Sequence, residues 1–334
     1  MIGKRRNTVS GALRLIVTYG VSALLLFRIT RSADLKSIVS GVVNADTSDY
    51  TVAVLLYLAA QLTSASKWRL FISNSRFINL FRWAVISQFF LTVIPGQVAG
   101  DFMRAYGVSK GGVQSSESAA CAILDRATGL IGMMILVVIA IQISSIDNIP
   151  HYLKVSSVIV LSLSVLFFCL SVVLGRRFRG LADHAGKGMF SRLLNFTGRT
   201  ALALNASGRD IPKVLFSILL SMLFHLLFAG MISVLAGSAV PGVSFLDWCW
   251  IGGMISIISL FPLSVGGLGV REGGFSALLA LFGVAVESAV ILSLTLFSIQ
   301  LIGASAGALL FFIESHRMKP QRDESKTSVC INDP

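Results

Sequence analysis

Two arginines, Arg104 and Arg271, follow proline-interrupted apolar segments and are the side chains best suited to bind an anion. Each one ends a Pro-x4-Gly-x3-Arg pattern, at residues 95–104 and again at residues 262–271. A guanidinium group can hold a phosphate through two parallel hydrogen bonds. The two patterns together therefore predict a site for an anionic head group, such as the phosphate of a phospholipid.

The backbone around both arginines is expected to contribute to the same site. Proline and glycine inside apolar sequence predict broken helices, and a helix N-terminus presents unpaired N–H groups that attract anions. Glycine also lets the backbone approach a ligand closely. The glycines expected at the site are Gly96, Gly100, Gly266, Gly267 and Gly269.

Acidic side chains accompany the arginines and are included in the predicted binding site: Asp101, Glu272 and the Asp125–Arg126 dipeptide. Charged groups at membrane depth are costly and by default mark a functional site. Burial raises the pKa of a carboxyl group, so Asp101 and Glu272 could also carry protons. The structural alternative is that neighbouring charges only hold broken helices together, through the pairs Arg271–Glu272, Asp101–Arg104 and Asp125–Arg126.

Composition places these residues in a membrane protein. Of the 334 residues, 54% are hydrophobic and 13% are charged, and the mean hydropathy is +0.80, whereas a soluble domain has about 25% charged residues. The net charge of +12 comes from loops between apolar runs, as the positive-inside rule describes, so no nucleic-acid partner is expected. The four scattered cysteines form no metal-binding or redox motif, and no cofactor or metal is predicted.

The apolar runs predict an all-α polytopic integral membrane protein with six full spans and two re-entrant or broken segments, or eight spans if both segments cross. Residues 84–94 provide only a short apolar run before Pro95, and a full crossing needs about 20 residues. The basic loop 176–213 is expected to contain an amphipathic helix near residues 190–204. The six spans are expected at about 11–27, 50–66, 118–144, 154–174, 214–236 and 288–313.

The order of these segments predicts an inverted repeat. The domain at residues 1–315 divides into pseudo-repeats of about 1–150 and 151–315, and a disordered cytoplasmic tail is expected at 316–334. Each half has three full crossings, an odd number, so the second half must be upside down relative to the first. Transporters with this plan place their sites near the midplane, at broken helices. Glu272 has no acidic counterpart, because Ala105 occupies the matching position.

The chain resembles the transmembrane, flippase-like family of lysylphosphatidylglycerol synthases, over roughly Leu13 to Phe312. The resemblance rests on the 95–104 segment, on Leu124-Asp-Arg126 and on Pro-Leu-Ser-Val-Gly-Gly-Leu-Gly-Val-Arg-Glu at 262–272. It implies a bacterial inner-membrane protein, with both termini cytoplasmic, that binds and translocates a phospholipid or glycolipid. The soluble aminoacyl-transfer domain of two-domain members is not expected after Ile313, so lysyl transfer by this chain is not predicted.

Two other classes of function stay open from the sequence. Asp46 and Asp49 follow the first predicted span, where membrane glycosyltransferases often place acidic residues, so a glycosyltransferase or lipid-modifying enzyme is one alternative. A non-catalytic scaffold is the other, with an envelope-lipid enzyme or glycosyltransferase as its partner. The sequence defines neither the oligomeric state nor the lipid.

Overall fold

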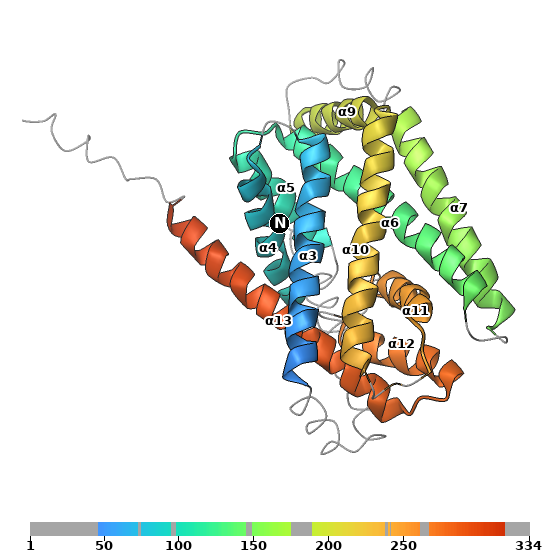
Figure 1. Ribbon diagram of the computed structural model, residues 1–334. Coiled ribbons are helices and arrows are strands. Elements are labelled where there is room, and N and C mark those ends of the chain that lie inside the picture. The colour runs from blue at the N-terminus through green and yellow to red at the C-terminus, as the bar shows by residue number, and fades with distance from the viewer. Residues whose placement is uncertain are drawn as a thin grey trace, which may run out of the picture.

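The computed structural model describes residues 46–72, 75–94, 98–144, 149–174, 189–237, 240, 242–260 and 267–317. All regular elements in this part of the chain are helical (Figure 1). The predicted first span, at residues 11–27, and nearly all of the predicted tail lie outside the described residues.

Within the described ranges, five helices have 24 residues or more, which is enough to cross a membrane. Four of them are also apolar enough by composition, and α3 has 25 residues with a more polar sequence. The predicted class, an all-α polytopic membrane protein, is confirmed. The five are α3 (Thr47–Phe71), α6 (Ser115–Ile143), α7 (His151–Leu174), α10 (Ile211–Ala236) and α13 (Val286–Arg317).

The first proline-interrupted segment forms a helical hairpin made of α4 (Phe77–Val93) and α5 (Val98–Lys110). Gly100 faces Leu91 and Gly107 faces Trp83, so α5 runs back along α4. The turn between them, at residues 95–97, lies outside the described residues. Because the chain returns along α4, this segment is re-entrant.

The second interrupted segment has the same form, with α11 (Phe245–Ile258) and α12 (Val270–Leu279), after which the 3₁₀ helix η3 (Ala280–Phe282) ends the return. Gly274 lies against Ile255, and the Trp250 ring stacks on Phe282 with 6.3 Å between the ring centroids. These contacts make α11 and α12 antiparallel, so this segment is a second re-entrant hairpin.

A capping box with a buried carboxylate starts α11. The Ser244 hydroxyl accepts a hydrogen bond from the Asp247 N–H at 3.2 Å, and the Asp247 carboxylate accepts one from the Ser244 N–H at 3.2 Å. Asp247 is fully buried and also accepts hydrogen bonds from the Trp250 indole at 3.0 Å and from Ser144. The same carboxylate thus caps the helix and fixes it to the end of α6.

The packing of the helices follows an inverted symmetry. In the first half α3 packs on α4 and α5 on α6; in the second half α10 packs on α11 and α12 on α13. Across the halves, α4 packs on α13 as α11 packs on α6. Gly237 faces Asp49 and Gly230 faces Leu56, so α3 and α10 run antiparallel at the centre (Figure 1). Matching helices with opposite directions agree with the predicted inverted repeat.

The predicted amphipathic helix is α9 (Met189–Gly208), and it packs on α6 and α7. Leu204 lies in a buried cluster with Ala120 and Leu124 of α6. The Asn205 side-chain amide donates a hydrogen bond to the Val172 carbonyl oxygen at 2.5 Å. Part of the apolar face of this helix therefore packs against the protein.

Close packing of α13 on α4 leads to a first testable prediction. A Cβ atom added at Gly307 would lie 2.4 Å from the Val85 carbonyl oxygen, a backbone atom that cannot move aside cheaply. We expect Gly307→Ala to lower the free energy of unfolding by about 1–3 kcal/mol, the usual effect of overpacking. Thermal unfolding of the purified protein in detergent measures this. Gly273→Ala is the matched control, because its Cβ would meet nothing within 4 Å, and an equal loss in both variants would contradict the prediction.

Candidate functional site: a charged cavity between two hairpins

A cavity of about 360 Å³ is lined by residues of both hairpins. Leu91 and Thr92 at the end of α4 line it from one side, and Leu260 and Gly267, which flank the second turn, line it from the other. Helices α3, α6 and α10 form much of the remaining wall. Six predicted site residues line it together: Asp101, Arg104, Asp125, Arg126, Gly267 and Arg271.

The other predicted residues are placed differently. Gly100 packs against Leu91 within the first hairpin, Gly269 is the N-cap of α12, and Glu272 is buried beside Arg271. Gly96 and Gly266 lie outside the described residues.

Arg104 is held by α3 and by an aromatic ring. Its two terminal nitrogens donate hydrogen bonds to Ser64, to the hydroxyl at 2.9 Å and to the carbonyl oxygen at 2.8 Å. The guanidinium carbon lies 4.3 Å from the centroid of the Trp68 ring, a cation–π contact. The side chain is 6% exposed, and its Nε has no hydrogen-bond partner among the described residues.

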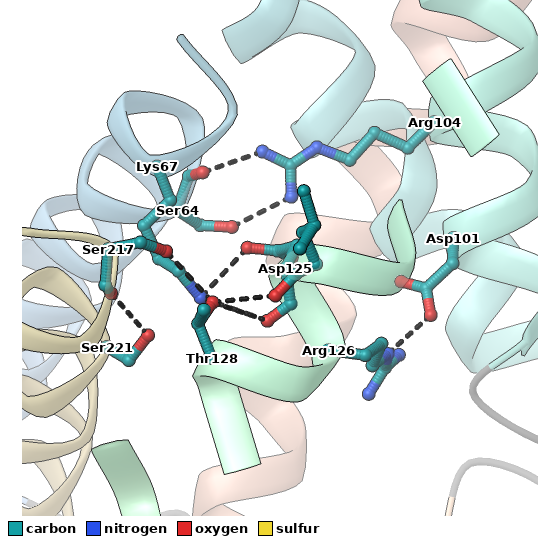
Figure 2. A network of polar contacts seen from close by, with 10 residues as sticks. Ser64, Lys67, Asp101, Arg104, Asp125, Arg126, Thr128, Ser217 and Ser221 are labelled. Carbon is teal, nitrogen blue, oxygen red and sulfur yellow. Dashed lines mark hydrogen bonds and ion pairs between the residues drawn. The ribbon is translucent and has the colours of Figure 1, made fainter. Parts of the chain in front are cut away.

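The carboxylates near Arg104 pair with other cations (Figure 2). The Lys67 ammonium lies 2.8 Å from Asp125 Oδ1 and also donates to the Asp125 carbonyl oxygen at 3.2 Å. The Arg126 Nε donates to Asp101 Oδ2 at 2.5 Å. The structural alternative predicted the ion pairs Asp101–Arg104 and Asp125–Arg126. Both predictions are wrong, because each carboxylate pairs with a cation on a different helix.

Lys67 is the charged residue of this site that sequence reasoning missed. Trp68 and Arg69 follow it directly, and cations next to aromatic rings at the end of an apolar run are typical of a membrane-interface segment. In the structure Lys67 is 6% exposed and lines the cavity. Its position three residues after Ser64 on a helix is a signal that could have indicated a shared face.

Hydroxyl groups join the neighbouring helices on the same side of the cavity. The Thr128 hydroxyl on α6 lies 2.9 Å from the Ser217 hydroxyl on α10, and the Ser221 hydroxyl donates to the Ser217 carbonyl oxygen at 2.7 Å (Figure 2). A Cβ atom on Gly132 would lie 2.8 Å from a backbone oxygen of α10. These contacts set α6 and Asp125 firmly against α10.

In the second half, Arg271 and Glu272 form the expected ion pair at 3.2 Å. Arg271 also donates to the Ser293 hydroxyl at 2.8 Å and to the Gln300 side-chain oxygen at 3.0 Å, both on α13. Glu272 accepts from the Gly269 N–H at 2.5 Å and from the Ser293 hydroxyl at 2.7 Å. Glu272 therefore caps α12 and fixes Arg271, a positioning role.

The cavity wall keeps an excess of positive charge. Lys67 pairs with Asp125, Arg126 with Asp101, and Arg271 with Glu272. Arg104 has no carboxylate within salt-bridge distance in the described part of the chain. An unneutralised buried cation is costly, so an anion entering the cavity would be stabilised at Arg104.

The acidic residues of the enzyme alternative lie elsewhere. Asp46 is exposed and caps α3, accepting hydrogen bonds from the Ser48 N–H at 2.9 Å and hydroxyl at 3.0 Å. These bonds hold the pKa of Asp46 below its usual value. Asp46 thus has a structural task of its own, although its catalytic role stays an untested hypothesis. Within the described ranges, no three His, Cys, Asp or Glu side chains are placed to hold a metal ion.

Membrane-length helices, two opposed re-entrant hairpins and a charged cavity between them define a multi-pass membrane protein with a buried polar site. The family described as the lysylphosphatidylglycerol synthase TM region matches residues 13–307. The chain belongs to this family, and the resemblance noted from the motifs is confirmed. No match to an individual curated protein was found.

Proposed function

We propose that the chain binds an anionic lipid head group in the cavity and carries it across the membrane while the acyl chains remain in the bilayer. The observation that carries this proposal is the buried Arg104, a cation without a carboxylate partner among the described residues. Its Nε–H has no hydrogen-bond partner among the described residues and is suited to donate to a phosphate oxygen. Membership of a lipid-related membrane family supports a lipid rather than a soluble anion.

The opposed hairpins support translocation in addition to binding. Each hairpin enters from one side and ends at the cavity, so each is suited to act as the gate for one leaflet. In inverted-repeat transporters the two halves open alternately around a fixed central site. The packing of α5 on α6 matches that of α12 on α13, as expected for two related halves of such a carrier.

We further propose that the basic end of the molecule faces the cytoplasm of a bacterium, across its inner membrane. Arg69 lies in the last turn of α3 and Arg76 follows the end of that helix, while Arg209 and Lys213 lie at the start of α10. These two helix ends lie at the same end of the molecule (Figure 1). Under the positive-inside rule this end is cytoplasmic.

Transport by the purified protein in liposomes tests the proposal. Phosphatidylglycerol labelled on an acyl chain with a dithionite-sensitive fluorophore reports which leaflet it occupies. Liposomes containing the protein are expected to expose nearly all of the label to external dithionite, whereas protein-free liposomes expose only the outer leaflet. Native mass spectrometry should detect bound anionic lipid in the same preparation. Equal protection with and without protein, together with no retained lipid, would overturn the proposed function.

A further inference from the structure

A strip of uncharged polar side chains connects the two arginines along the cavity wall. Its residues are defined as the polar strip: Tyr57, Gln61 and Ser64 of α3, Gln88 of α4 and Gln300 of α13, all of which line the cavity. Positions 57, 61 and 64 follow helical spacing and so share one face of α3.

The polar strip begins and ends at an arginine. Ser64 binds the Arg104 guanidinium, and Gln300 accepts a hydrogen bond from Arg271 at 3.0 Å. Between them, the Gln88 side-chain amide donates to the Gln61 side-chain oxygen at 3.2 Å. From Tyr57 to Ser64 the helix advances about 10 Å, which is comparable to the length of a phosphate linked to a sugar ring.

Three residues of the strip leave hydrogen-bonding capacity unused. Arginine can only donate, so Gln300 must turn its oxygen to Arg271, and its NH₂ group makes no hydrogen bond among the described residues. Gln88 uses one end of its amide on Gln61 and has no such bond at the other end. The buried Tyr57 hydroxyl, which lies over Gly303, has no partner in the described part of the chain.

Such a surface matches a chain of hydroxyl groups. An acyl chain would leave these polar groups unsatisfied, which is costly, and a cationic head group would be repelled by the excess charge at Arg104. Hydroxyl groups both donate and accept, so they can accept from the Gln300 NH₂ group and donate to the Gln88 side-chain oxygen. We propose that the strip binds the hydroxyl groups of a sugar or inositol linked to the lipid phosphate, an inference that rests on the proposed function.

Two lipids with the same phosphodiester charge and the same acyl chains test this inference. Phosphatidylinositol carries a ring of hydroxyl groups, whereas phosphatidylethanol carries none. Two or three additional hydrogen bonds should make the wild-type protein bind phosphatidylinositol about tenfold more tightly than phosphatidylethanol in native mass spectrometry titrations. The double variant Tyr57→Phe/Gln88→Leu should bind both lipids equally, at the level of phosphatidylethanol.

Controls separate this result from misfolding and from failure of the proposed function. Gln142→Leu/Tyr152→Phe changes the same residue types at exposed positions and should keep the preference. Tyr57→Phe alone removes a buried hydroxyl without a partner, so its unfolding temperature should stay level or rise.

Other results would contradict the assignment of the strip as a binding site for hydroxyl groups. If wild-type protein binds both lipids equally, or the double variant keeps the preference, the polyol assignment is wrong while the anion site stands. A clear loss of stability in Tyr57→Phe would likewise assign that hydroxyl a structural role and overturn the assignment. If wild-type protein binds neither lipid, the proposed function fails together with it.

Discussion

Replacement of Arg104 by methionine is expected to abolish anionic-lipid binding and leave the fold intact. The variant loses the one cavity cation that lacks a carboxylate partner among the described residues, while methionine keeps most of the buried side-chain volume. Loss of charge-assisted hydrogen bonds to phosphate should cost ~2–4 kcal/mol, a drop of about two orders of magnitude in affinity. Native mass spectrometry titration with phosphatidylglycerol measures the loss, and the liposome assay should show no transport.

Stability distinguishes this binding role from a structural one. Removal of an unpaired buried charge relieves a desolvation cost, which offsets the lost bonds to Ser64. The unfolding temperature of Arg104→Met should therefore stay close to that of the wild type. Arg69→Met is the matched control, since Arg69 is exposed on α3. A large fall in unfolding temperature with lipid binding preserved would show that Arg104 serves the fold.

In contrast to Arg104→Met, the variant Glu272→Ala is expected to lose much of its stability. The carboxylate is fully buried, accepts hydrogen bonds from Gly269 and Ser293, and pairs with Arg271. Its removal leaves Arg271 buried without its ion-pair partner, which typically costs about 3–5 kcal/mol. Thermal unfolding in detergent measures the effect, and Glu117→Ala, at an exposed position near the start of α6, should change little.

A second variant shows whether the stranded charge is the cause. Arg271→Met/Glu272→Leu replaces both partners by apolar side chains and should recover much of the stability lost in Glu272→Ala. If the double variant is as unstable as Glu272→Ala, the helix cap at Gly269 is the larger contribution. The hypothesis that Glu272 carries protons stays untested.

Local sequence was sufficient to predict the five membrane-length helices of the described residues and the two interrupted segments. A run of about 20 apolar residues has the length that crosses a hydrocarbon core as a helix, and Pro95 and Pro262 interrupt shorter runs at matching places. The Pro-x4-Gly-x3-Arg pattern occurs at matching positions in the two halves of the chain. This match was sufficient to predict that Arg104 and Arg271 line one cavity, because inverted halves bring matching segments to the centre.

Side-chain partners could not be predicted in the same way. Adjacent charges such as Asp125 and Arg126 point to different sides of a helix, and each pairs with a residue on another helix. The polar strip draws on three helices, and a single glutamine within an apolar run gives no local indication of what it faces. These contacts depend on how α3, α4 and α13 pack.

The two hairpins are anchored with unequal strength. Arg271 and Glu272 secure the second through a buried network, while the Arg126–Asp101 pair beside the first keeps 34% and 26% side-chain exposure, where ion pairs contribute little. In a carrier whose two gates are these hairpins, unequal anchoring gives the two gates different activation free energies for opening. The gate that opens more slowly then limits the turnover rate. These activation free energies do not change the equilibrium distribution of lipid between the two leaflets, because a passive carrier catalyses transport in both directions. Net movement toward one leaflet would then require a driving force, such as a lipid gradient or the membrane potential acting on the bound charge.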